Sequence, residues 1–370
     1  MSQKLLHRYT ERFLKRKASS FVLGGGIALF VFLMFFYIVA GKDIFAKPYI
    51  AGMANLEESI KINPLKQIDT LGPLDTALYD KKMIILANYP STTPTTTPRI
   101  WPAKAVYPNP GAILPFNRII AYYGNFYSKA MGVLGEYPED VMLAKLAAEV
   151  KKWNLADPET PVVPAINYIA VTAQGYAGDG KYRLRMPDSQ IDNAVRLAKQ
   201  INGIVILDVQ VGLSTLQIEI PLLEKYLKMP EVHLGIDPEF SMKTGAKPGT
   251  VIGSVNAEDV NFTTRYLAKL VQENNLPPKV LIIHRFTGNM VKGYREMKPL
   301  PEVQIVMDMD GWGPPAKKIG TYRQVIIPEP VQFTGFKIFY KNDLRAPSTR
   351  IMTPAELLSL SPRPSFIQFQ

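Results

Sequence analysis

Residues 203–212, GIVILDVQVG, and residues 232–240, VHLGIDPEF, decide the fold of this chain. In each stretch an apolar run rich in β-branched residues ends abruptly at an aspartate, Asp208 or Asp237. A run that is apolar at nearly every position suits a strand buried on both faces, as in a parallel sheet. Each of the two acids is therefore predicted to lie at the carboxyl end of a buried parallel strand.

Similar runs recur through residues 116–370, and stretches with helical apolar spacing separate several of them. We predict eight strands, at residues 119–123, 163–171, 204–209, 232–236, 280–286, 303–307, 333–340 and 366–369. Eight strands alternating with helices over about 255 residues indicate an α/β fold of the (β/α)8, TIM-type barrel class. An open doubly wound sheet is the alternative, but no glycine-rich dinucleotide loop follows the first strand.

The first forty residues predict a membrane anchor. Residues 1–20 hold six Lys or Arg and one acid, Glu11, and residues 21–40 (FVLGGGIALFVFLMFFYIVA) hold no charge. At ~1.5 Å per residue, a helix of that length crosses the ~30 Å hydrocarbon core of a bilayer. We therefore expect a basic cytoplasmic arm, then a single transmembrane helix in the lipid bilayer, with a cleaved signal peptide as the alternative. The positive-inside rule places everything after the span outside the cytoplasm, on the cell membrane.

Residues 41–115 are predicted to form a stalk and a linker rich in Pro and Thr, which includes STTPTTTP at residues 91–98. Within this segment we expect a short helix at 56–62 and a short strand at 83–87. Whether the stalk packs on the barrel that follows stays open at this point.

Composition excludes several classes of function. The chain has no cysteine, so disulfides, thiol nucleophiles and cysteine metal sites are excluded. The net charge is +11, and about half of it lies in the N-terminal arm. The remaining surplus is spread along a domain predicted to lie outside the cell, so we expect no nucleic-acid partner. No cofactor or resident metal is expected.

In a parallel barrel the carboxyl ends of all strands meet at one mouth, so polar residues there are site candidates. Asp237 and Glu239 are spaced to share one side of an extended strand, where burial and mutual repulsion raise one pKa. Glycoside hydrolysis needs such a protonated carboxyl group. We predict Glu239 as general acid, with Asp237 or Asp208 as its partner. The predicted substrate-binding residues are Tyr122, Tyr123, Asn167, Gln210, His284, Asp308, Asp310 and Trp312, whose aromatic members would stack on sugar rings.

The tripeptide Asp237-Pro238-Glu239 resembles the end of the D-x-x-D-x-D-x-E signature of chitinase-like glycosidases, in which the last Glu is the general acid. The earlier Asp positions of that signature are not matched. Strings such as YYGNFYSKAMGVLGEYPED, GIVILDVQVG, GIDPEF, KVLIIHRF, DMDGWG and FIQFQ resemble an uncharacterised family of secreted or lipid-anchored bacterial barrel proteins common in actinobacteria. That resemblance implies a barrel outside the cytoplasm and implies no activity.

Three functions follow from these patterns. The first is a membrane-anchored, extracytoplasmic glycosidase-like hydrolase that acts on a glycan of the cell envelope. The second is a barrel that binds an envelope polymer or protein without chemistry. The third is a metal-dependent hydrolase, in which hard oxygen ligands would suit Mg²⁺ or Ca²⁺; its candidate ligands are Asp208, Asp237, His284, Asp308 and Asp310.

Overall fold

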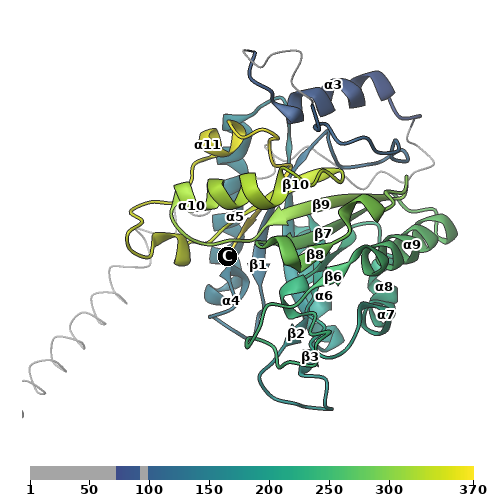
Figure 1. Ribbon diagram of the computed structural model, residues 1–370, viewed down its shortest axis with the longest axis vertical. Helices are drawn as coiled ribbons and strands as arrows, with labels where there is room; N and C mark the ends of the chain where they lie inside the picture. The colour runs from purple at the N-terminus through teal and green to yellow at the C-terminus, as the bar shows by residue number, and fades with distance from the viewer. Residues whose placement is uncertain (1–71, 92–98) are drawn as a thin grey trace, which may run out of the picture. The chain divides into compact units, whose positions relative to one another are not determined.

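Eight parallel strands close into a barrel in the computed structural model (Figure 1), which describes residues 72–91 and 99–370. Around the barrel they are β1 (Arg118–Gly124), β2 (Val162–Ala173), β4 (Ile204–Val209), β5 (Val232–Ile236), β7 (Lys279–Arg285), β9 (Val303–Met309), β10 (Phe333–Ile338) and β11 (Phe366–Phe369). The barrel is closed because β1 pairs in parallel with both β2 and β11. Each predicted strand corresponds to one of these eight, so the barrel class is confirmed.

Helices surround the barrel (Figure 1). The long ones are α5 (Glu139–Ala156), α6 (Asp188–Gln200) and α9 (Ala257–Glu273); the short ones are α4 (Val133–Glu136), α7 (Leu216–Glu219), α8 (Glu224–Leu227), α10 (Pro315–Thr321) and α11 (Pro354–Leu358). Their apolar stripes pack on the outward-facing residues of the strands, as Met142 and Leu146 of α5 do in one cluster with Ile120. Three short strands lie outside the barrel circle: β3 (Arg183–Arg185), β6 (Val255–Asn256) and β8 (Val291–Lys292).

The amino-terminal half of the barrel interior is packed mainly with apolar side chains. Alternate residues at the strand starts, such as Ile119, Val163 and Ile204, form one buried cluster. The same cluster includes Tyr79, Met83 and Leu86 of α3 (Thr76–Ala87), which cover this end of the barrel. Part of the predicted stalk therefore packs on the barrel and buries its base.

The predicted strand at residues 83–87 is wrong, because these residues form the second half of α3. Asp75 caps this helix by accepting a hydrogen bond from the N–H of Leu78 at 2.9 Å. The buried residues Tyr79, Met83 and Leu86 are spaced by four and three positions, which is helical spacing. The apolar run MIILA is thus the end of a longer helical pattern.

The side chain of Gln304 in β9 binds the backbone of residues 113 and 114 at the base of the barrel. Its fully buried amide oxygen accepts hydrogen bonds from the N–H groups of Ile113 and Leu114, at 3.0 and 3.1 Å. Its amide nitrogen donates to the carbonyl of Leu114 at 2.6 Å. One side chain therefore satisfies three backbone groups that are shielded from water.

The cytoplasmic arm (residues 1–20) and the transmembrane helix (residues 21–40) predicted from the sequence lie outside the described residues. Among the helices in residues 72–91 and 99–370, none combines the length and the apolar character needed to cross a bilayer.

Replacing Gln304 by Leu should destabilise the fold, because it leaves two N–H groups and a carbonyl buried without partners. Each such group costs about 1–3 kcal/mol, so the free energy of unfolding should fall by several kcal/mol, measured by urea denaturation. The matched control is Gln200→Leu at the exposed end of α6. Equal stability of the two variants would contradict the role assigned to Gln304.

Candidate active site

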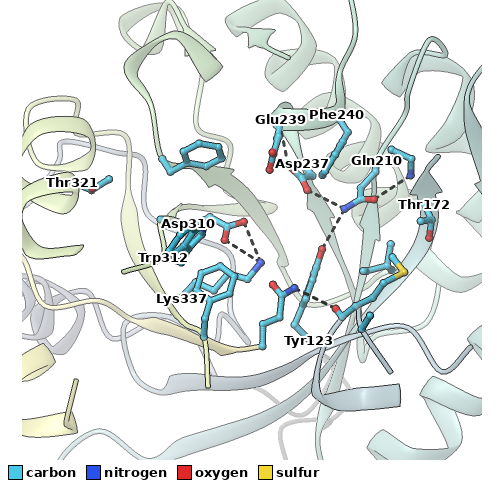
Figure 2. A pocket seen from close by; sticks show the side chains of 18 of the residues that line it. Tyr123, Thr172, Gln210, Asp237, Glu239, Phe240, Asp310, Trp312, Thr321 and Lys337 are labelled. Atoms are coloured by element: carbon cyan, nitrogen blue, oxygen red, sulfur yellow. Dashed lines mark hydrogen bonds and ion pairs between the residues drawn. The ribbon is translucent and has the colours of Figure 1, made fainter. Parts of the chain in front are cut away.

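A cavity of about 630 Å³ opens at the carboxyl ends of the barrel strands. Figure 2 shows the side chains that line it, and they come from most of the strands around the barrel. Among them are Tyr123, Gln210, Asp237, Glu239, Asp310, Trp312 and Lys337. The mouth predicted from the strand ends is therefore a real, open pocket with both carboxylates and aromatic rings in its wall.

Asp237 and Glu239 lie together in this wall, on a tight turn. β5 ends at Ile236, and residues Pro238–Phe240 form a single turn of 3₁₀ helix that Asp237 caps. One carboxylate oxygen of Asp237 accepts the N–H of Glu239 at 3.1 Å, and the other accepts the amide of Gln210, also at 3.1 Å. The turn therefore brings both acids to the pocket. The predicted extended strand over these residues is wrong.

Both acids hold their protons more tightly than free carboxyl groups do. Burial, together with the negative charges of Asp237 and Asp310, raises the pKa of Glu239 to about 7, while Lys337 and His284 oppose this rise. Burial likewise raises the pKa of Asp237 to about 6 against the opposing charge of His284. Near neutral pH Glu239 is therefore a partly protonated carboxyl group facing an open cavity, as general acid catalysis requires.

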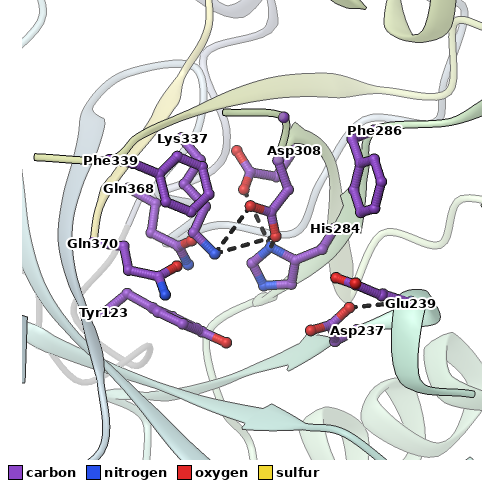
Figure 3. Close-up of polar contacts among 12 residues, drawn as sticks. Tyr123, Asp237, Glu239, His284, Phe286, Asp308, Lys337, Phe339, Gln368 and Gln370 are labelled. Carbon is purple, nitrogen blue, oxygen red and sulfur yellow. Dashed lines mark hydrogen bonds and ion pairs between the residues drawn. The ribbon is translucent and has the colours of Figure 1, made fainter. Parts of the chain in front are cut away.

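His284 is fully buried beneath the cavity and lies close to three aspartates, one of which, Asp308, is seen beside its ring in Figure 3. Its Nε2 is 2.9 Å from Asp208, and its Nδ1 is 3.3 and 3.2 Å from Asp308 and Asp310. Only the contact with Asp208 is aligned as a hydrogen bond; the two Nδ1 contacts are ion-pair distances. Burial lowers the pKa of His284, but the three aspartates outweigh it and raise this pKa well above its usual value. His284 is therefore a buried imidazolium cation.

Lys337 of β10 is the second cation of the site. Its ammonium lies 3.0 and 3.1 Å from the two carboxylate oxygens of Asp310 and 4.0 Å from the ring centroid of Tyr123. Burial raises the pKa of Asp310, but Lys337 and His284 outweigh it and lower this pKa below its usual value. Asp310 is therefore held as a carboxylate, in contrast to Glu239. Burial raises the pKa of Asp308 against the opposing effect of His284.

Two glycines make room for the buried aspartates. A Cβ at Gly235 of β5 would collide with Oδ1 of Asp208, and one at Gly335 of β10 would come within 2.5 Å of Oδ1 of Asp308. Both glycines lie on strands next to the aspartate in question, since Asp208 pairs with Gly235 and Asp308 with Gly335. The absence of two side chains inside the barrel is thus what allows Asp208 and Asp308 to point inward.

Amide side chains connect the remaining polar groups. Asn167 donates to Asp208 at 3.1 Å and accepts from Gln368 of β11 at 2.7 Å. Gln210 accepts the N–H of Ala173 at 3.1 Å and contacts the hydroxyl of Tyr123 at 3.4 Å. Gln210 thus holds Asp237 in position, and Asn167 holds Asp208.

The structure brings together all but one of the predicted site residues. Tyr123, Gln210, Asp237, Glu239, Asp310 and Trp312 line the cavity, and Asn167, Asp208, His284 and Asp308 are fully buried in the barrel interior and do not line it. Of the two partners considered for Glu239, Asp237 is in the pocket wall and Asp208 is not.

Tyr122 is the exception. Successive strand residues face opposite sides, so Tyr122 points outward when Tyr123 points inward. Its ring packs edge-on against Tyr340 and Phe369, and its hydroxyl lies 3.2 Å from that of Tyr340. The predicted role of Tyr122 in substrate binding therefore finds no support, because two adjacent tyrosines in the sequence do not reveal which one faces the interior.

Sequence reasoning missed Lys337, Gln368 and Gln370. Lys337 and Gln370 line the cavity, and Gln368 holds Asn167. A signal was present, since a lysine inside the apolar run FTGFKIF and glutamines alternating with phenylalanines in FIQFQ mark the inward face of β10 and β11.

The segment at residues 174–187, which connects β2 to α6, is partly fixed. Its residues 183–185 form β3, antiparallel to β2. Arg183 and Arg185 bind the fully buried carboxylate of Glu219, at 2.8 and 2.7 Å. Ion pairs with a buried carboxylate therefore tie β3 to α7.

The residues proposed for a metal site are engaged with one another. Within the part of the chain that the structure describes, no group of three His, Asp or Glu side chains is arranged to hold a metal ion. The imidazolium of His284 and the ammonium of Lys337 already supply the positive charge among these carboxylates. The donor set therefore does not fit a metal-dependent hydrolase.

Comparison with known proteins adds little to this geometry. No protein-family profile matches the chain, and no curated protein does. A solved cellulase, Cel5C_n, is similar over 60% of this chain and 65% of its own, with 13% identity and a TM-score of 0.35. A ruminal GH26 endo-beta-1,4-mannanase is similar over 68% of this chain and 58% of its own, with 12% identity and a TM-score of 0.34. The chain thus spans less than two thirds of either enzyme, and the strand pairing alone establishes the barrel.

The raised pKa of Glu239 makes a prediction for stability. A carboxyl group that binds its proton more tightly in the folded state contributes stability at low pH that is lost as the pH rises through the folded-state pKa. For Glu239 this window runs from its ordinary pKa of 4.5 to about 7. Thermal melts across that range should show a smaller loss of stability in Glu239→Gln than in the parent. Exposed Glu159 provides the control, and Glu159→Gln should keep the slope of the parent; identical slopes in all three proteins would contradict the assignment.

Proposed function

We propose that this protein is a glycosidase-like hydrolase with Glu239 as its general acid. The observation that carries the proposal is a half-buried carboxyl group, with a pKa of about 7, in the wall of an open cavity that also contains aromatic rings. Cleavage of a glycosidic bond requires a proton on the leaving oxygen, and a carboxyl group of this pKa can deliver it near neutral pH.

The proposed role of Asp237 is to position and tune Glu239. It accepts the N–H of Glu239, and its negative charge contributes to the raised pKa of that residue. Gln210 fixes Asp237 from the other side. When Glu239 gives up its proton, the carboxylate that results faces Lys337 and His284, whose positive charges favour that product.

Aromatic side chains supply surfaces for sugar rings. Tyr123, Phe240, Phe286 and Trp312 line the cavity from four different strand ends. Pockets for small molecules commonly combine such apolar surfaces with a few fixed polar groups. The arrangement suits a ring with one apolar face and polar edges, which describes a sugar unit.

The proposed setting is the cell envelope. The basic arm and the apolar run at residues 21–40 support an anchor with the barrel outside the cytoplasm, and the substrate would then be an envelope glycan. Membership of the actinobacterial barrel family is part of this proposal and rests on the quoted strings alone.

A second candidate is a barrel that binds an envelope polymer without cleaving it. One observation favours it: Asp310, the third carboxyl group in the cavity wall beside Asp237 and Glu239, is neutralised by Lys337. A nucleophile or base for the second half of the reaction must then be Asp237 or a group of the substrate. Binding of glycans without release of reducing ends by the parent protein would support this candidate.

Glu239→Gln should lower the turnover of an unactivated oligosaccharide by ~10²-fold or more, because general acid catalysis contributes on that order. The melting temperature should barely change near pH 4.5, where the parent residue is protonated and as neutral as Gln; at pH 8 the variant should melt no lower than the parent, because the parent then carries a half-buried carboxylate. Reducing ends released from a panel of envelope glycans measure turnover.

An aryl glycoside with an acidic phenol as leaving group is the matched control substrate, since its departure needs no proton. Glu239→Gln should retain far more activity on it than on the oligosaccharide. Equal losses on both substrates, or no loss on either, would exclude Glu239 as the general acid.

A further inference from the structure

Helix α3 is apolar on two opposite faces. Tyr79, Met83 and Leu86 are buried against the base of the barrel. On the opposite side Leu78, Ile84 and Ile85 are 40%, 67% and 40% exposed. The outer side also carries exposed Asp80 and Lys81, so it combines aliphatic side chains with charges. Such a mixed surface is suited to a partner that is apolar and charged at the same boundary.

The apolar surface extends beyond the helix. Tyr107 packs edge-on against Tyr79, at 5.4 Å between ring centroids, and its hydroxyl donates to Asp80. Tyr107 and its neighbour Val106 are exposed, and so is Ile100, which precedes Trp101 at the far end of the helix. We call the exposed group of Leu78, Ile84, Ile85, Ile100, Val106 and Tyr107 the base patch.

Three cations are close in sequence to residues of the base patch: Lys81 within α3, Arg99 beside Ile100, and Lys104 two residues before Val106. Lys81, Arg99 and Lys104 are exposed, and within residues 72–91 and 99–370 none of the three forms an ion pair with a carboxylate. The acids near α3 include Asp75, which caps the helix, Asp80, which accepts from Tyr107, and exposed Glu159, whose backbone carbonyl accepts from Lys82. Arg99 lies over the ring of Tyr89, at 5.1 Å from its centroid. Aliphatic side chains and a tyrosine close to Lys and Arg that form no ion pair are the composition of surfaces that lie in a membrane interface.

The position of the base patch also fits contact with a membrane surface. It covers the amino-terminal ends of the barrel strands, whereas the cavity lies at their carboxyl ends. The predicted span at residues 21–40 is separated from α3 by 35 residues, from 41 to 75, and α3 is the first described helix after that predicted span.

We propose that the base patch docks on the surface of the lipid bilayer, with Leu78, Ile84, Ile85 and Ile100 in the interface and Lys81, Arg99 and Lys104 at the level of anionic headgroups. The cavity then faces away from the membrane and toward the polymers of the envelope. This inference rests on the anchoring included in the proposed function and is independent of catalysis by Glu239.

The chain has no cysteine, so single labels can be placed without altering any native thiol. Ile84→Cys, Ile85→Cys and Ile100→Cys report on the base patch. The matched control is Tyr176→Cys, on the loop after β2 at the cavity end, where the parent side chain is 84% exposed. Each full-length variant is spin-labelled and reconstituted in vesicles of phosphatidylcholine and phosphatidylglycerol.

Electron paramagnetic resonance then measures how often each label collides with two reagents. Oxygen concentrates in hydrocarbon, and a nickel chelate stays in water, so the two collision rates locate the label. Labels at 84, 85 and 100 should collide several-fold less with nickel than the label at 176, and more with oxygen. In vesicles of phosphatidylcholine alone this contrast should weaken, because the headgroup charge is lost.

Two results would overturn the inference. Nickel access equal to that of the control means that the patch faces water. Low access to both reagents means that protein covers it, either an earlier segment of this chain or a second copy. Failure of the protein to float with the vesicles would remove the anchor itself, and turnover in detergent would still test Glu239 separately.

Discussion

Five carboxyl groups and two cations share the carboxyl-terminal half of the barrel interior and the wall of its cavity: Asp208, Asp237, Glu239, Asp308 and Asp310 against His284 and Lys337. Water cannot solvate this excess of negative charge, so part of it is removed by protonation. Burial together with like charges raises the pKa of Asp237, Glu239 and Asp308, although His284 and Lys337 oppose the rise. The acidity of Glu239 is therefore a property of the whole cluster.

The barrel can hold such a cluster because its two halves are built differently. The half near α3 is packed with apolar side chains and closed by the hydrogen bonds of Gln304. In the other half, Gly235 and Gly335 leave the space that the carboxylates of Asp208 and Asp308 occupy. The polar half keeps buried oxygens without a hydrogen-bond partner, among them both carboxylate oxygens of Asp308, and such groups lower the stability of the fold.

The parts of the fold that could be predicted from the sequence are those in which a single physical signal, such as burial of a strand on both faces, dominates the pattern. Eight strands were predictable because a strand buried on both faces must be apolar, and an acid such as Asp208 or Asp237 marks where that burial ends. The tight turn at Pro238–Phe240 was not predicted. It forms because Asp237 caps it, whereas the prediction treated Asp237-Pro238-Glu239 as extended strand. The roles of Tyr122 and Lys337 could not be predicted without knowing which residues of β1 and β10 face the barrel interior. The three-dimensional pairing of the strands determines that, and composition does not. The helix at 76–87 was missed because its two apolar faces hide the usual helical pattern.

The pKa of the Glu239 side chain tests the account most directly. Glutamate labelled with ¹³C at its carboxyl carbon gives one resonance per residue, and Glu239→Gln identifies the resonance of interest by its loss. A pH titration of that resonance should have its midpoint near 7, well above the ordinary value of 4.5. A midpoint near 4.5 would show that the charge cluster does not hold the proton, and would contradict both the electrostatic account and the general acid role.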